Sequence, residues 1–368
     1  MKRRKFLAGA GLAAGAATLA SAVARPAIAQ DRLEWKMVTS WPKGLPGLGT
    51  GAERLAERIT KASDGRLNVK VFAADELVPA LGCFDAVSQG TADMGHDASS
   101  YHIDKLPAAG FFNAMPMGLT AGEMNGWVYF GGGQELWDEL YAPFNVKPFL
   151  AGNTGTQMGG WFRKEINSTA DLKGLKFRIV GHGARVLTKL GVEVVPLPNG
   201  EIFSGLQSGA IDGAEWVGPY NDLSLGFYKI TKLYYWPGFQ EPGSALQCMI
   251  NKGRFEALPD ELKQIVAACC SAENDMMLAE FNGRSPAALN SLVNEHGVQL
   301  RQFPRDVLVA LGEASGTVMQ ELLEGGDDIT RQIASSYLRF RQDAMRYTRV
   351  SETAFATARL YKFDFPKG

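Results

Sequence analysis

Apolar and polar residues alternate in short runs near the start of the chain. Residues 33–42 (LEWKMVTSWP) and 66–74 (RLNVKVFAA) alternate with the period of a β-strand. Between them, apolar residues in 49–65 recur on one face of a helix. A further helix around 79–89 leads to 89–97 (QGTADMGHD). This β-α-β-α-β order predicts a mostly parallel sheet covered by helices.

The same order of elements returns in the second half of the chain. The pattern predicts a strand at 175–181, a helix at 182–191 and a strand at 192–198. Residues 200–216 are predicted to form a helix followed by a strand. The segments 89–93 (QGTAD) and 208–212 (SGAID) each close a helix with glycine and open a strand through aspartate. We therefore interpret the chain as two related α/β lobes, which suits its 368 residues.

From about residue 255 the pattern becomes helical. One helix is predicted to begin near Pro259, with Asp260 and Glu261 in its first turn. Near the end of the chain, apolar residues recur at spacings of three and four, at Ile329, Ile333, Tyr337, Phe340, Ala344 and Tyr347. This pattern predicts an amphipathic helix of about thirty residues. It packs across its own lobes in one interpretation and docks on a second subunit in the other.

The N-terminal segment has the pattern of an export signal. Arg3 and Arg4 head an Ala/Gly-rich run that ends at the small-x-small site 27–29. We expect residues 1–29 to be a cleaved signal of the twin-arginine type, because low hydrophobicity and the cleavage site disfavour a membrane anchor. Without these residues, 33 basic residues face 39 acidic ones, a net charge of about −6. That balance argues against nucleic acid or an anionic membrane as partner.

Searches for catalytic motifs find none. The chain has no His-Glu-x-x-His, no Gly-x-Ser-x-Gly and no phosphate loop, and its four histidines are scattered. This argues against an enzyme. The four cysteines have no Cys-x-x-Cys spacing, and the adjacent pair, Cys269 and Cys270, is expected to be buried as small apolar residues.

Several polar residues stand among glycines and aromatics. Asn153 and Gln157 lie beside glycines, which let the backbone approach a ligand closely. Arg178 lies inside an apolar strand, where a buried charge must be paired and a guanidinium can bind a carboxylate with two hydrogen bonds. An exposed strand face is the alternative for Arg178. For Glu215, beside Trp216, and for Glu241, the alternative is a surface acid.

Five segments together resemble one family along the whole mature chain. They are VFAADELVPAL, GNTGTQMGGWFR, LKGLKFRI, GAIDGAEWVGPY and YYWPGFQEPG. With the export signal, they look like the solute-binding proteins of TRAP transporters, in the branch that binds 2-oxo and related 2-hydroxy acids. The resemblance implies a periplasmic-binding-protein-like α/β fold with two lobes, a hinge, a ligand cleft and a long C-terminal helix.

The resemblance also implies a division of the chain and a place in the cell. Lobe I would comprise 30–152 plus about 243–285, and lobe II would comprise 153–242. Residues 286–368 would form C-terminal helices that pack across the lobes, with a homodimer contact as the alternative. The protein would be periplasmic and would deliver its ligand to the TRAP membrane subunits.

The family's site residues carry over by motif. Arg178 would bind the substrate carboxylate and Asn153 would assist, with Tyr101 as a pocket aromatic. The metal ligands would be Gln157, Glu215, the Trp216 carbonyl and Glu241, with Gln157 and Trp216 also contacting the substrate. Two residues differ from the pattern, Gln240 and Pro242, and Gln240 leaves the size of the pocket open.

The implied metal is Ca²⁺ or Na⁺, because hard cations take oxygen ligands. Two glutamates and a monoanion against one arginine leave a charge of −2, which favours the divalent ion. The expected function is capture of a pyruvate- or lactate-like monocarboxylate. The alternatives are a larger or aromatic carboxylate, a metal-dependent oxo-acid enzyme with His102 or Tyr101 moving protons, and a sensory protein that presents its ligand to a receptor.

Overall fold

The computed structural model describes residues 32–364 and residue 366. The expected export signal, residues 1–29, lies outside the described residues. No helix in the described part of the chain combines the length and the apolar character that a membrane crossing requires.

One lobe, which we call the first lobe, is built around a five-stranded sheet in the described residues, with the order β2-β1-β3-β10-β4. Its strands are β1 (Leu33–Thr39), β2 (Leu67–Phe72), β3 (Met94–Asp97), β4 (Val146–Asn153) and β10 (Ala245–Asn251). The strand β1 is parallel to β2 and β3, as the sequence predicts. The late strand β10 enters antiparallel between β3 and β4, so the sheet is mixed.

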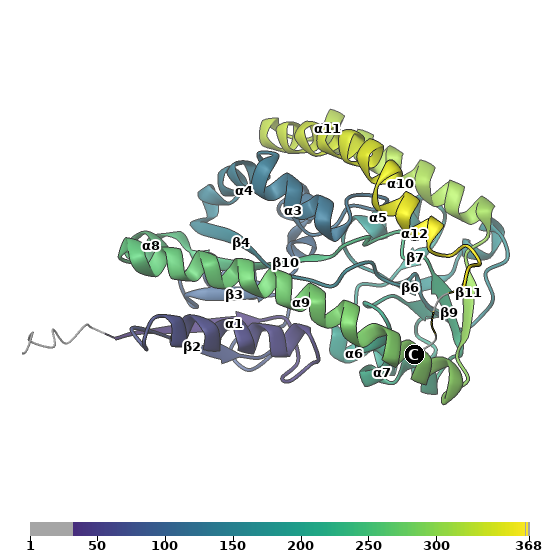
Figure 1. Ribbon diagram of the computed structural model, residues 1–368, viewed down its shortest axis with the longest axis horizontal. Coiled ribbons are helices and arrows are strands. Elements are labelled where there is room, and N and C mark those ends of the chain that lie inside the picture. The colour runs from purple at the N-terminus through teal and green to yellow at the C-terminus, as the bar shows by residue number, and fades with distance from the viewer. Residues whose placement is uncertain (1–31, 365, 367–368) are drawn as a thin grey trace, which may run out of the picture.

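The second lobe is built around a six-stranded sheet in the described residues, with the order β11-β9-β5-β8-β6-β7. Its strands are β5 (Gly160–Phe162), β6 (Lys176–Arg178), β7 (Glu193–Val194), β8 (Gly213–Ala214), β9 (Leu233–Trp236) and β11 (Gln299–Gln302). The strand β6 is parallel to β7 and β8, whereas β5 is antiparallel to β8 and β9. The two sheets lie at opposite ends of the molecule (Figure 1).

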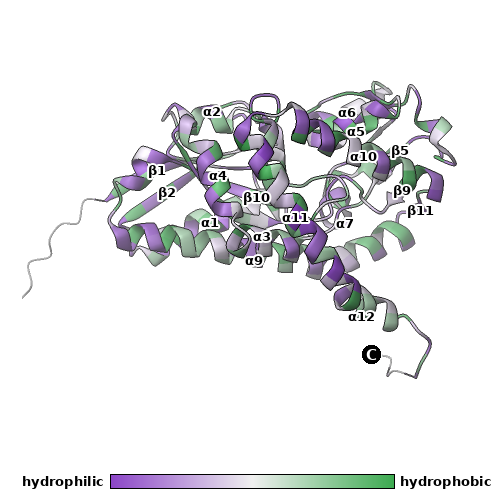
Figure 2. Cartoon of the chain, turned by 90° about the horizontal axis from the view of Figure 1, so that it is seen from above, coloured by the Kyte–Doolittle hydropathy of each residue, from purple (hydrophilic) through white to green (hydrophobic). Residues whose placement is uncertain are grey.

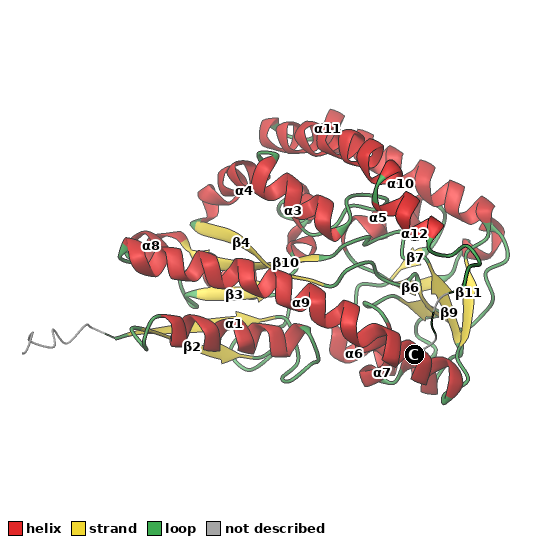
Figure 3. Cartoon of the chain, in the orientation of Figure 1, coloured by secondary structure: helices red, strands yellow, loops and turns green. Residues whose placement is uncertain are grey.

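Helices cover both sheets (Figure 3). The α-helices are α1 (Leu48–Ala62), α2 (Cys83–Ser88), α3 (Ala121–Phe130), α4 (Gly133–Tyr141), α5 (Gly181–Lys189), α6 (Asn199–Ser208), α7 (Pro219–Leu225), α8 (Lys252–Glu256), α9 (Asp260–Asn294), α10 (Arg305–Gly325), α11 (Asp328–Val350) and α12 (Glu352–Ala358). The short 3-10 helices are η1 (Ser99–His102), η2 (Pro107–Phe112), η3 (Ala142–Phe144), η4 (Thr169–Leu172) and η5 (Phe227–Lys229).

The helix α9 connects the two lobes. It begins at Asp260, next to the predicted start, and continues for 35 residues through Pro286. In Figure 1 it runs from β3 and β4 of the first lobe to α6 and α7 of the second. Its side chains contact β4 and α1 on one lobe and α7 on the other. One continuous helix therefore contacts both lobes.

The C-terminal helices return along the opposite side of the molecule. The helix α10 packs on α5 of the second lobe, and α11 packs on α3, α4 and η2 of the first. Within the predicted long helix, Ile333 and Tyr337 are buried, while Tyr347 is exposed. All four cysteines are free and buried, as expected for Cys269 and Cys270.

Candidate functional site

A cavity of about 30 Å³ lies between the two lobes, enough for one or two water molecules. It is lined by Trp41, Leu48, Ala98, Ser100, Tyr101, Thr154, Gln157, Arg178, Val180, Glu215, Trp216, Val217, Glu241, Ser244 and Leu246. The cavity therefore brings together six of the residues singled out in the sequence: Tyr101, Gln157, Arg178, Glu215, Trp216 and Glu241. Arg178 ends β6 and Glu215 follows β8, whereas Tyr101 lies in η1 and Gln157 and Glu241 lie in the segments between β4 and β5 and between β9 and β10.

Arg178 and Glu215 form a buried ion pair at the ends of two neighbouring strands. In the β6–β8 register Arg178 is opposite Ala214, so Glu215 follows directly beside it. The Arg178 Nη1 lies 2.5 Å from Glu215 Oε1 and 3.0 Å from the Glu215 carbonyl, and Nε donates to the Leu197 carbonyl at 2.9 Å. The two side chains are 2% and 3% exposed. The alternatives of an exposed strand face and a surface acid are therefore wrong for these two residues.

Burial and the neighbouring charge have opposing effects on the pKa of Glu215. Burial raises the pKa of Glu215, and the nearby Arg178 guanidinium opposes that shift. The guanidinium carbon of Arg178 also lies 5.3 Å from the ring centroid of Trp216, within cation–π range. A carboxylate ligand or a cation in the cavity would therefore meet a charge that is desolvated and already oriented.

Gln157 and Glu241 form the second polar pair of the cavity. The Gln157 Nε2 donates to Glu241 Oε2 at 2.6 Å and to Thr154 Oγ1 at 3.2 Å. Gln157 also accepts a backbone hydrogen bond from Gly238 at 3.0 Å. A Cβ at Gly238 would lie 2.5 Å from the Gln157 carbonyl oxygen, so only glycine allows this approach. Burial raises the pKa of Glu241.

Trp216 and Trp41 form an aromatic wall that comes from both lobes. Their rings are T-shaped with centroids 6.5 Å apart, and Trp41 makes a similar contact with Tyr101 at 6.1 Å. The Trp216 Nε1 donates to Asn221 Oδ1 at 3.2 Å, and Asn221 Nδ2 donates to the Pro46 carbonyl at 2.6 Å. This chain of bonds ties the wall of the second lobe to the first lobe.

Two other residues singled out in the sequence lie next to the cavity without lining it. Asn153 ends β4 and is fully buried, and its Oδ1 accepts from the Gly155 backbone at 2.8 Å. Its Nδ2 has no hydrogen-bond partner among the described residues. Gln240 is buried and donates to the Met158 carbonyl at 2.9 Å, so its side chain packs behind the cavity.

Four polar or aromatic lining residues were not identified as site residues from the sequence: Trp41, Ser100, Thr154 and Ser244. Ser100 is buried, and its Oγ has no partner in the part of the chain that the structure describes. The sequence signal that could have identified Ser100 is the pair of small polar residues, Ser99 and Ser100, directly before Tyr101. They follow a strand directly, which is where ligand-contacting loops of α/β sheets begin.

The oxygen atoms of the cavity fit a hard cation. Glu215 and Glu241 supply carboxylates, and Gln157 Oε1 is buried without a partner among the described residues. No group of three or more His, Cys, Asp or Glu in the described residues is placed to hold a metal ion, so a set of four protein ligands at this cavity would include an amide and a backbone oxygen. Such an all-oxygen set suits Ca²⁺ or Na⁺ and not zinc or copper.

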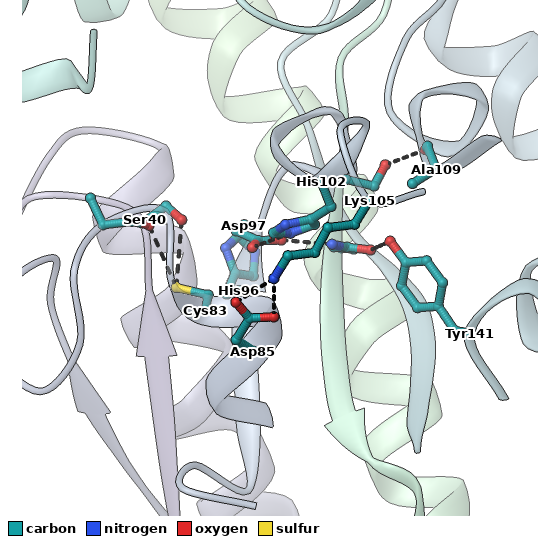
Figure 4. A network of polar contacts seen from close by, with 12 residues as sticks. Ser40, Cys83, Asp85, His96, Asp97, His102, Lys105, Ala109 and Tyr141 are labelled. Atoms are coloured by element: carbon teal, nitrogen blue, oxygen red, sulfur yellow. Dashed lines mark hydrogen bonds and ion pairs between the residues drawn. The ribbon is translucent and has the colours of Figure 1, made fainter. Parts of the chain in front are cut away.

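His102 belongs to a separate buried network beside the cavity (Figure 4). Its Nε2 lies 2.8 Å from Asp97 Oδ2, and Gln247 Nε2 donates to Asp97 Oδ1 at 2.7 Å. Tyr141 donates to Gln247 at 3.0 Å. The network joins η1 to β3, β10 and α4. It therefore fixes the backbone that carries Ser100 and Tyr101, and its groups are satisfied by each other.

The model of the family described as bacterial extracellular solute-binding protein, family 7, matches residues 38–325. A monocarboxylate 2-oxoacid-binding periplasmic protein of Nostoc sp. is 40% identical over 359 residues, covering 96% of this chain and 98% of that protein. These proteins are receptors for transport and not enzymes.

Two crystal structures have the same fold along nearly their whole length. A TRAP solute-binding protein of Bordetella bronchiseptica, a dimer with calcium and picolinate in one site, has a TM-score of 0.87 at 38% identity and covers 89% of this chain and 97% of its own. One from Pseudoalteromonas atlantica, with sodium and pyruvate, has a TM-score of 0.86 at 36% identity and covers 90% and 100%.

The family match and these likenesses agree with the two-lobed fold and with the cavity between the lobes. Members of the family act outside the cytoplasm, where they bind small carboxylates and work with membrane subunits. This chain belongs to family 7 of the bacterial extracellular solute-binding proteins and is a solute-binding protein of a TRAP transporter.

Proposed function

We propose that this protein captures a small 2-oxo or 2-hydroxy monocarboxylate together with a metal ion and delivers it to the TRAP membrane subunits. The observation that carries the proposal is the buried Arg178, placed beside two glutamates in a cavity closed by both lobes. The pyruvate in the Pseudoalteromonas structure supports it, as does the 2-oxoacid in the name of the Nostoc relative.

Arg178 binds the ligand carboxylate in this proposal. Its bonds to the described residues go through Nε and Nη1. Nη2 then faces the ligand, and Nη1 exchanges Glu215 for the second carboxylate oxygen. Asn153 contributes its buried Nδ2, and Tyr101 and Trp216 enclose the rest of the ligand. The small cavity, about 30 Å³, disfavours a larger or aromatic carboxylate.

Gln157, Glu215, Glu241 and the Trp216 carbonyl hold the metal ion in this proposal. The ion would balance the two carboxylates and bridge them to the ligand's oxygens. Gln157 Nε2 now donates to Glu241. To present its oxygen to the metal ion, the Gln157 amide would turn over, so that Oε1 takes the place of Nε2. Glu215 leaves Arg178 at the same time, so one exchange of partners frees both the guanidinium and the carboxylate.

Capture then works by closure of the two lobes on the ligand. Ligand and metal contact groups from both lobes, so they bind the closed form more tightly and increase its population. We propose the boundaries 30–152 plus about 243–285 for lobe I and 153–242 for lobe II. Within the remaining segment, 286–368, the first residues continue α9, β11 pairs with β9 in the second sheet, and the later helices pack across both lobes.

Two further assignments complete the proposal. Residues 1–29 act as a twin-arginine signal and direct the protein to the periplasm. The end of the chain contacts a second copy, because α12 projects from the body of the molecule (Figure 2). The exposed large apolar residues in this region include Tyr347, Val350, Phe355, Leu360 and Tyr361. Such a patch is typical of an interface.

Calorimetric titration tests the central claim. Mature, calcium-replete protein is titrated with pyruvate, lactate, 2-oxobutyrate, 2-oxoisovalerate and phenylglyoxylate, and again after chelation. We expect tight binding of one small acid that is lost with chelator and in Glu215→Ala. Binding that ignores both chelator and Glu215→Ala would show that the metal-bridged site is wrong.

A further inference from the structure

His182 makes a contact between the lobes that the proposed ligand and metal site does not use. It lies in the first turn of α5, four residues after Arg178, on the second lobe. Its Nε2 lies 2.9 Å from the carbonyl of Pro107, the first residue of η2 on the first lobe. The side chain is buried, and its ring packs 6.3 Å from Phe111, measured between ring centroids.

Gly110 leaves the space that this imidazole occupies, and we call this space the seat of His182. A Cβ at Gly110 would lie 2.6 Å from His182 Nε2, closer than atoms in contact can come. Beside it, a Cβ at Gly181 would lie 3.0 Å from Ser100 Cβ, and Ser100 lines the ligand cavity. The start of α5 therefore touches η1 and η2 along a continuous seam, and this seam closes one side of the site.

The buried surroundings of the His182 ring favour its neutral form. A carbonyl only accepts, so Nε2 carries the proton that is donated to Pro107. The Nδ1 is buried and has no partner among the described residues. A proton on Nδ1 would bury a cation with an unpaired donor, which is costly. Burial accordingly lowers the pKa of His182 to about 4.

The charged groups near the ring do not offset that cost. On its own helix, Arg185 adds a like charge and pairs with Glu321 of α10. On η1, His102 is already bonded to Asp97. The sequence of η2, PAAGFF, contains no titratable group. Tyr337 of α11, which packs on η2, bonds the Leu119 backbone, and Asp104 lies across the outer groove that His182 lines.

We propose that His182 is a positioning residue for ligand capture: its neutral imidazole, seated on Gly110 and bonded to Pro107, holds the lobes closed over the site. It touches neither ligand nor metal and acts through the population of the closed form. This inference rests on the proposed capture by closure. It makes the ligand affinity depend on pH, because protonated His182 cannot enter its seat.

The direction of the pH effect follows from the two forms. In an open form the ring is solvated, with an ordinary pKa of about 6.5. Closure requires the neutral ring, so the affinity is full above that pH and falls as pH decreases towards 4. Each pH unit in this window weakens binding by up to about tenfold. At pH 5 the His182 contribution is a loss of roughly thirtyfold relative to pH 7.5.

The test measures pyruvate binding at saturating Ca²⁺ from pH 7.5 to 5.0 in the wild type and in five variants. His182→Gln keeps a donor at the Nε2 position and does not titrate, and His182→Ala removes the bond. Gly110→Ala fills the seat, and a Gly110→Ala/His182→Ala double variant tests whether the two act together. His296→Gln is the matched control, since His296 stacks on Tyr228 away from the cavity.

We expect His182→Gln to match the wild type at pH 7.5 and to lose much less affinity at pH 5. We expect His182→Ala and Gly110→Ala each to weaken binding about tenfold or more, mainly through faster release. In the double variant, Gly110→Ala should add little, because the clash is gone. Equal pH profiles for wild type and His182→Gln, or additive losses in the double variant, would overturn the inference.

A ligand-free measurement separates this inference from the proposed function. Failure of pyruvate to bind wild-type protein at pH 7.5 would reject the assigned ligand and would leave the seat of His182 untouched. Small-angle scattering then decides. A radius of gyration that grows between pH 7.5 and 5 in the wild type, and stays constant in His182→Gln, supports the proposal that neutral His182 holds the lobes closed. The same growth in both proteins, or no growth in the wild type, overturns it.

Discussion

Arg178 holds Glu215 at 2.5 Å from Nη1 to Oε1, with both side chains almost fully buried between the lobes. The guanidinium thus neutralises a carboxylate that would otherwise be a buried, unpaired charge. In the proposed capture, an anion bound at Arg178 would release Glu215, and a cation bound at Glu215 would release Arg178. The two ligands should therefore bind with positive coupling, each relieving the cost of separating this pair.

Replacement of Arg178 by lysine tests the carboxylate contact. Arg178→Lys keeps the charge and loses the planar pair of donors, so we expect pyruvate affinity to fall about 10- to 100-fold. Calorimetry at fixed Ca²⁺ measures the change. Arg163→Lys is the matched control, because Arg163 is exposed on the same lobe. Unchanged affinity in Arg178→Lys would place the carboxylate elsewhere.

Replacement of Glu241 by glutamine tests the metal site. Glu241→Gln removes one of two buried carboxylates and keeps the shape of the side chain, so we expect Ca²⁺ affinity to fall by more than tenfold. Na⁺ should lose less, because a monovalent ion gains less from each negative charge. Direct titration with each ion measures both effects. Glu165→Gln, at an exposed glutamate, serves as control, and equal losses in the two variants would contradict the assignment.

Asp222 should make the stability of the second lobe depend on pH. Burial raises its pKa to about 6, although Trp161 and Tyr234 donate hydrogen bonds to its Oδ2 at 2.8 and 2.6 Å. The folded form therefore favours the protonated acid. This contribution is present below the unfolded pKa, near 4, and is lost as pH rises through about 6, by about 3 kcal/mol in all.

Asp222→Asn removes this titration, so its free energy of unfolding should change less between pH 4 and 7 than that of the wild type. Denaturant unfolding at several pH values measures the difference. Asp275→Asn, at an exposed position of α9, should follow the wild-type profile. Parallel profiles for wild type and Asp222→Asn would show that Asp222 stays ionised in the fold.

Substitutions that introduce charges near the end of the chain test the proposed dimer. We expect Phe355→Lys combined with Val350→Lys to convert a dimer to a monomer, because both side chains are exposed on the C-terminal helices. Light scattering during gel filtration gives the mass. Met276→Lys, at a half-exposed position of α9, is the control. A wild-type monomer, or a dimer that persists in the double variant, would show that these helices serve only their own chain.

Local patterns predicted the major elements and missed their limits. The strand at 33–42 forms as Leu33–Thr39, while the strand predicted at 192–198 forms over only two residues, because prolines at 196 and 198 cannot donate to a sheet. The helix predicted to begin near Pro259 begins at Asp260. It continues through Gly283 and Pro286, where contacts with α7 outweigh weak local propensity.

The site was predictable only where its chemistry is visible in one segment. Arg178 in an apolar strand and Glu215 beside Trp216 stand out, and the structure brings them together. Trp41 and Ser100 do not stand out, because they reach the cavity from separate loops of the first lobe. The seat of His182 on Gly110 joins residues 72 positions apart, and no local pattern reports such a contact.

The position of β10 determines the order in which the chain can fold. This strand lies between β3 and β4, so the central pairing of the first sheet is missing until residues 245–251 have been synthesised. The whole second sheet except β11 is made before that point. A ribosome-bound chain would therefore complete most of its later lobe first, leaving the earlier lobe with open strand edges for several seconds. Chaperone binding should concentrate on β3 and β4 during that interval.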